Sequence, residues 1–393
     1  MKYDFVVIGA GIQGAGVAQA AAAAGYSVLV LEQTAVAAGT SSKSSKLIHG
    51  GLRYLESAQF GLVRESLHER ALLLKLAPEL VKLQPLHIPL YKDSTRSPLM
   101  IRAGLSLYAL LAGLDKNALF RSLPQSKWST LDGLKQANLR AIFRYHEAQT
   151  DDAALTRAVL HSAQTLGAEL LIPARFISAQ RDASSCRVIY EKSGRQDSVS
   201  CRVMVNCAGP WAQAVIAQVH PTLAFPALDL VRGSHLLLPP LLKQHFYLEA
   251  PQDKRAVFAL PWQGKLLLGT TERLHTEAPE KAHCTSAEQE YLLTTLQHYF
   301  PHLQIVPEQI ESFAGLRVLP RSDKNAFVRP REVLFAVDNE HQPRILSVMG
   351  GKLTTYRKTA QMALSRLRPS LPGKIARADT SCLALIPVDK NLC

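Results

Sequence analysis

The chain has 393 residues, of which 47% are hydrophobic, so it can bury more than one domain's worth of core and is not a disordered protein. Its formal net charge of +13 suits anionic partners, either small molecules or an anionic membrane surface. The six cysteines form no C-x-x-C pair, so neither a zinc site nor an iron–sulfur cluster is indicated. Since no secretion signal is visible, we expect reduced thiols in a cytoplasmic protein.

The N-terminal segment has the pattern of a dinucleotide-binding unit. Residues 3–8 form an apolar run typical of a parallel strand that is buried on both faces. Gly9 then allows a tight turn, Gly11 lets the backbone approach a pyrophosphate, and Gly14 lets a helix pack on the strand. An alanine-rich helix and a second strand follow, and Glu32 ends that strand where a carboxylate would accept the ribose hydroxyls. This order predicts dinucleotide binding.

The next segment, residues 40–56, is rich in hydroxyl groups and glycine. It follows the dinucleotide-binding unit directly, so we expect it where the pyrophosphate and the ring of a bound cofactor would lie. Its end supplies His49, Arg53 and Tyr54, which can hold a small anion against that ring.

Two later segments favour FAD over a nicotinamide cofactor. Residues 203–211 read as a buried strand that ends in a small-residue turn, which lets the chain pass close to the nucleotide. Residues 345–349 read as a strand, followed by a turn at Gly350-Gly351 and a helix predicted over residues 353–367. The N-terminus of that helix, with Lys352, would stabilise negative charge on a reduced flavin. Elements spread over the whole chain fit an extended FAD, and no second glycine fingerprint for NAD(P)H is present.

Several arginines lie in or beside apolar strands: Arg232 before a strand that contains His235, Arg317 within another, and Arg329 in a similar setting. A buried guanidinium needs an anion, and its fork matches phosphate or carboxylate oxygens. The alternative for each arginine is an ion pair within the protein. Candidate carboxylates for such pairs are Glu56, Glu311 and Asp323.

Five motifs together resemble the FAD-dependent glycerol-3-phosphate dehydrogenase family, within the glycine-oxidase-like and D-amino-acid-oxidase-like flavoproteins. The resemblance runs from about residue 1 to residue 368. The motifs are residues 44–56, Gly233-Ser234-His235, Gly269-Thr270-Thr271, Gly315-Leu316-Arg317 and residues 350–357.

The resemblance implies a set of site residues. Those expected around the substrate are Arg53, Tyr54, His235, Arg317, Arg329 and Lys352. Of these, His235, Arg317, Lys352 and Arg53 would take part in the chemistry. Those expected to bind FAD are Gly9, Gly11, Ile12, Gly14, Glu32, Thr40, Ser41, Ser45, Lys46, Leu47, His49, Gly50, Ala208, Gly209, Gly351, Lys352, Leu353 and Thr354, and no metal is expected.

The implied reaction is hydride transfer from C2 of sn-glycerol 3-phosphate to flavin N5, which gives dihydroxyacetone phosphate. His235 is the first choice of base because the ordinary pKa of histidine suits neutral pH. Arg53 and Lys352 would stabilise the developing alkoxide, while Arg317 and Arg329 would hold the phosphate. Quinone is the implied electron acceptor, with oxygen or a partner subunit as alternatives. Assembly as a homodimer is kept as an alternative to a monomer.

The expected fold is α/β, with a Rossmann-like FAD-binding domain and a second, mostly antiparallel β substrate domain. The FAD-binding domain would comprise residues 1–80, 148–224 and 333–370, and the substrate domain residues 81–147 and 225–332. Pro78, Pro85, Pro89 and Pro98 predict a loop-rich entry to the substrate domain, and residues 371–393 a loose tail. Many family members instead continue into a helical or cysteine-rich C-terminal domain.

An apolar helix predicted over residues 99–114 is too short to span a bilayer, and Arg96 and Arg102 flank its apolar residues. It is typical either of an interfacial helix on the cytoplasmic face of the inner membrane or of a buried helix. Two other functions stay open. One is a flavin oxidoreductase for a 2-hydroxy acid or an amino acid. The other is a flavoprotein acting on tRNA, which the basic charge alone suggests, since no nucleic-acid-binding motif is present.

Overall fold

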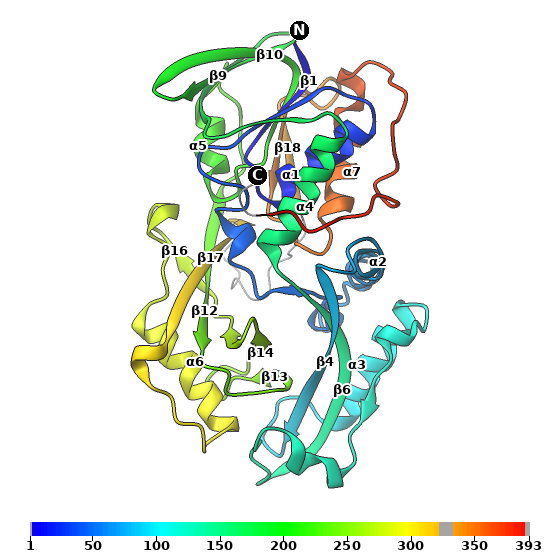
Figure 1. Cartoon of the computed structure of the whole chain (residues 1–393), viewed down its shortest axis with the longest axis vertical. Coiled ribbons are helices and arrows are strands. Elements are labelled where there is room, and N and C mark those ends of the chain that lie inside the picture. The colour runs from blue at the N-terminus through cyan, green and yellow to red at the C-terminus, as the bar shows by residue number, and fades with distance from the viewer. Residues whose placement is uncertain (1, 322–332, 390–393) are drawn as a thin grey trace.

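The computed structural model describes residues 2–321 and 333–389, and in it the chain forms two β-sheets with helices packed on them. Figure 1 shows the N-terminal strand β1 with α1, α4 and α7 in the upper half, and β12, β13, β14 and α6 in the lower half. The mixed α/β architecture is the fold class that the sequence predicts.

Among the described residues, the upper sheet has nine strands in the order β11-β8-β9-β10-β1-β2-β7, with β19 beside β10 and β18 beside β19. β1 pairs in parallel with β2 and β10, and β10 pairs in parallel with β19. The carboxyl ends of these four strands therefore lie on one edge, which is where open α/β sheets bind ligands. The strands are β1 (Tyr3–Ile8), β2 (Val28–Leu31), β7 (Glu169–Leu171), β8 (Arg175–Arg181), β9 (Cys186–Lys192), β10 (Arg195–Asn206), β11 (Val219–His220), β18 (Leu334–Val337) and β19 (Ile345–Met349).

Helices α1 (Ile12–Ala23), α4 (Asp152–Thr165) and α7 (Tyr356–Leu367) pack together beside this sheet. α1 is almost entirely buried, because its small alanines and glycines let both neighbouring helices approach closely. A short helix, α5 (Ala212–Ala217), follows β10.

The lower sheet has ten strands within residues 2–321 and 333–389, in the order β16-β12-β15-β14-β13-β4-β6-β3, with β17 beside β12 and β5 beside β6. Its pairings are antiparallel except for β13 with β4. The strands are β3 (Leu47–Ile48), β4 (Val81–Tyr91), β5 (Arg121–Ser122), β6 (Leu139–Thr150), β12 (Leu228–Leu238), β13 (His245–Glu249), β14 (Ala256–Trp262), β15 (Lys265–Gly269), β16 (Arg273–His275) and β17 (Glu311–Pro320).

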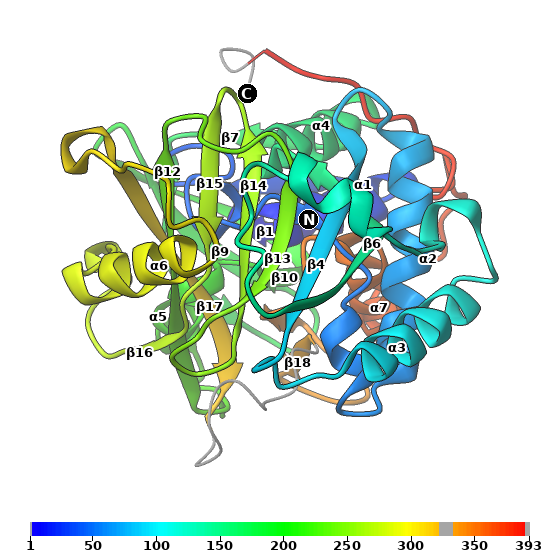
Figure 2. The same cartoon turned by 90° about the horizontal axis from the view of Figure 1, so that it is seen from below.

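Three helices accompany the lower sheet. Figure 2 shows α2 (Phe60–Leu76) and α3 (Pro98–Leu111) beside β4 and β6, and α6 (Ser286–Tyr299) at the opposite side near β12. A capping box, in which the Thr285 and Glu288 side chains bond reciprocally to backbone N–H groups, starts α6.

Two local predictions are wrong. The proline-containing segment is the long strand β4, which accommodates Pro85 and Pro89 because β13 pairs with it only at Leu86 and His87. The last helix, α7, begins at Tyr356 and not directly after the glycine turn, so residues 352–355 form a loop between that turn and the helix.

The C-terminal segment also differs from the loose tail that the sequence predicts. Leu385 is buried in the upper core, and its backbone N–H donates to the Leu76 carbonyl of α2. Arg357 of α7 donates both to Glu69 of α2 and to the Thr380 hydroxyl. The segment therefore holds α7 and α2 together.

Candidate active site

The glycine-rich turn after β1 packs closely against the turn after β10. Gly9 has a φ of +97°, and a Cβ there would lie 2.8 Å from the Cys207 carbonyl oxygen. A Cβ on Gly14 would lie 1.9 Å from the Gly9 carbonyl oxygen, so only glycine lets α1 start so near the strand. The N–H of Ile12, in the first turn of α1, donates to the Ser41 hydroxyl over 2.8 Å. The first hydroxyl-rich turn is thereby held at the helix N-terminus.

Glu32 lies at the end of β2, as the sequence predicts. Its carboxylate accepts the Ala10 N–H over 2.9 Å and the Thr34 N–H over 2.8 Å. Glu32 thus also braces the glycine turn, with lone pairs remaining for further donors.

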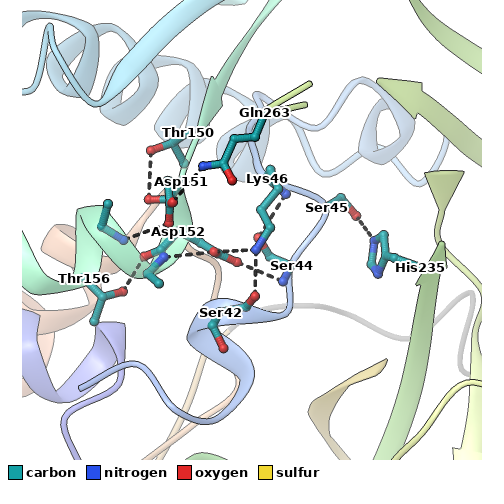
Figure 3. A network of polar contacts seen from close by, with 12 residues as sticks. Ser42, Ser44, Ser45, Lys46, Thr150, Asp151, Asp152, Thr156, His235 and Gln263 are labelled. Atoms are coloured by element: carbon teal, nitrogen blue, oxygen red, sulfur yellow. Dashed lines mark hydrogen bonds and ion pairs between the residues drawn. The ribbon is translucent and has the colours of Figure 1, made fainter. Parts of the chain in front are cut away.

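An ion pair that the sequence did not indicate fixes the hydroxyl-rich loop. Lys46 Nζ lies 2.6 Å from Asp152 Oδ1, and both side chains are buried. Asp152 also accepts the Ser44 N–H over 2.9 Å, while Lys46 donates to the Ser42 carbonyl (Figure 3). The ammonium of Lys46, expected at the cofactor, is therefore engaged by the N-terminus of α4. Asp152 is not among the site residues that the sequence predicts.

A second buried network holds the loop at Gly50. The Gly50 N–H donates to the Tyr108 hydroxyl over 3.0 Å, and that hydroxyl donates to Glu147 over 2.6 Å. Arg70 donates to the same carboxylate over 2.6 Å. These residues come from α2, α3 and β6. The sequence does not predict the network, because its members are far apart along the chain and only the tertiary fold brings them together. On the other side, the His49 N–H donates to the Thr354 hydroxyl over 3.2 Å.

His235 lies in β12 with only 2% of its surface exposed. Its Nε2 is hydrogen-bonded to the Ser45 hydroxyl over 2.8 Å (Figure 3). Its ring stacks on Phe313, with centroids 4.9 Å apart. Burial, and then the charges of Arg317 and Lys46, lower the pKa of His235 to about 3. The ordinary histidine pKa that the sequence suggests is therefore wrong for His235.

Three glycines around His235 leave space that a larger side chain would fill. A Cβ on Gly269 would lie 2.2 Å from the His235 ring, and one on Gly315 would lie 2.6 Å from the Lys43 carbonyl oxygen. Gly233 leaves room for the Arg317 guanidinium, whose Nη2 lies 3.1 Å from where a Cβ would be. In the pairing of β12 with β17, Arg317 is opposite Val231 and Phe313 is opposite His235, with the Gly233–Gly315 pair between them. Alternate residues of a strand point to the same face, so the Arg317 guanidinium and the His235 imidazole share this face.

Arg317 also forms an ion pair with buried Glu272, at 3.6 Å, and Glu272 is contacted by Arg255 as well. The neighbouring Arg232 pairs with Glu288 at 2.9 Å. Glu56 and Glu311, which were candidate partners for the arginines of the site, pair with Arg96 and Lys265, respectively. Arg329 and Asp323 lie outside the described residues.

A second cationic group forms around Tyr54, which is buried. Lys352 Nζ lies 3.9 Å from the centroid of the Tyr54 ring and 3.3 Å from the Ser66 hydroxyl. The Arg53 guanidinium carbon lies 5.9 Å from the same centroid. The structure thus arranges the predicted substrate residues in two groups, His235 with Arg317 and Lys352 with Arg53 and Tyr54. Residues 45–54 run from the first group to the second.

Other predicted residues follow strands of the upper sheet or lie in the segment of residues 40–56. Ala208 and Gly209 follow β10, and Gly351 and Leu353 follow β19. Thr40 donates to the Leu316 carbonyl of β17 over 2.8 Å, which ties the loop to the lower sheet. Leu47 lies in β3 and pairs with Gln149 of β6.

Comparison with known proteins gives consistent matches over nearly the whole chain. The family model described as "FAD dependent oxidoreductase" matches residues 4–357. The glycerol-3-phosphate dehydrogenase of Pseudomonas aeruginosa is 39% identical, covering 93% of this chain and 72% of that protein. The D-erythritol 1-phosphate dehydrogenase of Brucella abortus is 35% identical, covering 97% of this chain and 79% of that protein.

A solved structure of the glycerol-3-phosphate dehydrogenase from Bacillus halodurans complexed with FAD has a TM-score of 0.76 at 26% identity, and the match covers 98% of this chain and 68% of that one. The glycine oxidase of Geobacillus kaustophilus shares the fold, with a TM-score of 0.69 at 19% identity over 98% of both chains.

Proposed function

The chain belongs to the family of FAD dependent oxidoreductases, and from this membership and the geometry of the site we propose that it oxidises sn-glycerol 3-phosphate to dihydroxyacetone phosphate. One observation carries the proposal. The loop whose Ser41 binds the N-terminus of α1 reaches His235 of the lower sheet only four residues later, through Ser45. The loop therefore brings the nucleotide edge and the His235–Arg317 group together.

The residues on the nucleotide edge fit FAD on a structural ground independent of the relatives. The side-chain oxygen of Gln13, in the first turn of α1, is buried and has no hydrogen-bond partner among the described residues. A Cβ on Gly351 would lie 2.6 Å from the nitrogen of the same amide, so this amide lies between α1 and the glycine turn after β19. A polyhydroxyl ligand in that position would satisfy the oxygen. When bound, FAD supplies the acceptor for the hydride.

The cationic residues take separate parts in the proposed reaction. Arg317 holds the phosphate, because a guanidinium matches two phosphate oxygens and Glu272 keeps it in place. Lys352 and Arg53 stabilise negative charge on the C2 oxygen as the hydride leaves C2. The substrate loses one hydride and one hydroxyl proton in total, so a proton acceptor is required.

His235 acts as that acceptor only in the complex. Burial is the largest cause of its lowered pKa and the charge of Arg317 the second, and a dianionic phosphate placed on Arg317 offsets this second cause. Substrate binding therefore raises the basicity of the imidazole. This coupling keeps His235 neutral in the free enzyme and makes it a base when the hydroxyl is present.

We also infer that the electrons pass to a quinone at an anionic membrane surface on the cytoplasmic side. The support is an apolar surface around α3: Leu99 is 76% exposed, Leu110 62% and Leu114 62%, with Arg102 exposed among them. No helix within residues 2–321 and 333–389 is long and apolar enough to cross a membrane. Co-sedimentation with anionic vesicles, weakened in Leu99→Gln/Leu110→Gln, tests the surface. Assembly as a homodimer stays a prediction, which light scattering tests by measuring the molar mass in solution.

Turnover with a dye acceptor separates the candidate substrates. The panel comprises sn-glycerol 3-phosphate, D-erythritol 1-phosphate, 2-hydroxyglutarate and glycine. We expect the highest kcat/KM for sn-glycerol 3-phosphate, and Arg317→Ala should raise its KM by about 100-fold because a charge-assisted pair to phosphate is lost. The tetritol phosphate is the second candidate because a relative that acts on it is 35% identical. A preference for 2-hydroxyglutarate or glycine would refute the proposal.

A further inference from the structure

The imidazole of His235 is held on three sides. Phe313 stacks on its face, with ring planes 13° apart. The edge with Cδ2 lies over Gly269, where no side chain intervenes. Nε2 is hydrogen-bonded to the Ser45 hydroxyl over 2.8 Å, and Figure 3 shows this contact reaching from the loop to the β12 side chain. Stacking and the close backbone restrict the ring plane, and the hydroxyl distinguishes one nitrogen from the other.

The other ring nitrogen, Nδ1, is buried and makes no hydrogen bond within residues 2–321 and 333–389. Leaving a buried polar atom unpaired costs free energy, and such atoms in native proteins call for an explanation, such as a ligand that pairs with them. Since Nε2 already has a partner in the protein, Nδ1 is the nitrogen that remains for a ligand.

We propose that Ser45 is a positioning residue: it accepts a hydrogen bond from Nε2–H of His235 and so presents Nδ1, without a proton, to the C2 hydroxyl of the substrate. This inference rests on the proposed function. The proton of the hydroxyl passes to Nδ1 as the hydride leaves C2, and the resulting imidazolium carries one N–H toward Ser45 and one toward the C2 oxygen. The Ser45 hydroxyl then accepts a charge-assisted hydrogen bond, which stabilises the imidazolium.

The alternative hydrogen-bond direction predicts different chemistry. If the Ser45 hydroxyl donated to Nε2, Nδ1 would carry the proton and could only donate to the substrate oxygen. His235 would then be an electrostatic stabiliser and not a base. The two directions differ in the position of one proton, which nitrogen NMR detects.

The first experiment uses holoenzyme labelled with ¹⁵N-histidine, with the His235 signals assigned by their loss in His235→Asn. We expect Nδ1 to give the signal of an unprotonated nitrogen and Nε2 that of a protonated one, and Ser45→Ala to show both tautomers. A protonated Nδ1 in the wild-type enzyme would overturn the inference. This readout does not depend on turnover, so it remains decisive if the enzyme oxidises another substrate.

The second experiment compares Ser45→Ala, Ser45→Thr and Ser42→Ala in steady-state kinetics. Ser45→Ala should lower kcat about 10-fold with little change in KM, while Ser45→Thr, which keeps the hydroxyl, should restore most of it. The acid limb of the kcat–pH profile should move to lower pH in Ser45→Ala, because the imidazolium loses its acceptor. Ser42→Ala is the matched control, since that hydroxyl in the same loop donates to the Gly39 carbonyl.

The outcomes separate this inference from the proposed function. If His235→Asn impairs turnover but Ser45→Ala changes neither kcat nor its pH profile, the positioning role is wrong and the proposed function stands. If sn-glycerol 3-phosphate is not oxidised by the wild-type enzyme, the proposed function is wrong, and the tautomer measurement alone tests the role of Ser45. Flavin content and melting temperature of each variant exclude loss of folding as the cause.

Discussion

His235 shows how burial changes the chemistry of a residue that the sequence predicts at the site. A histidine beside Gly233 and Ser234 suggests a base of ordinary pKa. However, its strand β12 lies between β15 and β17, and the charges of Arg317 and Lys46 act on its ring. Its free-enzyme form is therefore the neutral imidazole. No pattern in the sequence gives the burial, because the residues that exclude water come from β15 and β17 and from the loop of residues 40–56.

The lowered pKa of His235 predicts a pH-dependent stability. In the folded state His235 binds a proton only below about pH 3, whereas in the unfolded chain it binds one below the ordinary pKa of 6.5. Stability from the neutral ring is thus complete above pH 6.5 and is lost as the pH falls. Between pH 7 and pH 5 the wild-type protein should lose on the order of 2 kcal/mol relative to His235→Asn. Urea unfolding of both proteins at the two pH values measures this, and an unchanged difference would contradict it.

The Lys46–Asp152 pair predicts a strong coupling between two variants. Asp152→Ala leaves a buried ammonium without its carboxylate and should cost about 3–5 kcal/mol. The double variant Lys46→Met/Asp152→Ala removes both charges and should be more stable than Asp152→Ala alone. Chemical denaturation of the two single variants and the double variant measures the coupling energy. Additive losses would show that the pair does not act as a unit.

At the scale of elements, the sequence predicts regular segments well where periodicity is strong. The β1-α1-β2 unit, the end of β10 and the strand β19 lie where the pattern places them. It fails where a long-range partner overrides a local signal. β4 forms through two prolines because β6 pairs along its whole length, and α7 starts three residues late because Thr354 instead contacts His49. The contact between Thr354 and His49 joins segments that follow strands of different sheets, and no local sequence pattern predicts it.

Glycine positions on strands and helices give opposite predictions that only the structure distinguishes. An alanine at Gly315 would place Cβ 2.6 Å from the Lys43 backbone oxygen, so the loop must move. A Cβ on Gly104 of α3 would meet no packed neighbour within 4 Å among the described residues. Gly315→Ala should lower stability by about 2 kcal/mol and weaken FAD retention. Gly104→Ala should raise stability by about 0.5–1 kcal/mol, because alanine favours a helix. Melting temperature and flavin content check both, and a harmless Gly315→Ala would refute the close approach.

At the scale of the whole molecule, the C-terminal segment and the hydroxyl-rich loop connect parts that are far apart in sequence. The segment joins α7 to α2, and the loop joins the nucleotide edge to the lower sheet. The sequence predicts the cofactor and the site residues through motifs, but not these connections. The domain bounds also stay a prediction. β3 and the last residues of β6 lie in the lower sheet, although they fall within residues 1–80 and 148–224, which the sequence analysis assigns to the FAD-binding domain.

The C-terminal segment makes a direct stability prediction with a neighbouring control. Leu385 is 2% exposed, whereas Ile386 is 57% exposed. Leu385→Ala should lower stability by about 2–4 kcal/mol, since a buried cavity forms against the upper core. Ile386→Ala should change it by less than about 0.5 kcal/mol. Thermal unfolding of both holoenzymes decides, and equal effects would mean that the segment is not packed in solution.

The loop of residues 40–56 connects the nucleotide edge to the His235–Arg317 group, and the proposed oxidation of sn-glycerol 3-phosphate depends on this arrangement beside a bound flavin. Its most direct test is the absorption spectrum of the purified holoenzyme under anaerobic conditions before and after sn-glycerol 3-phosphate is added. We expect the oxidised-flavin bands to bleach in the wild-type enzyme at low substrate concentration, and in Arg317→Ala only at concentrations about 100-fold higher. Flavin bands that stay unchanged in the wild-type enzyme at saturating sn-glycerol 3-phosphate would contradict it.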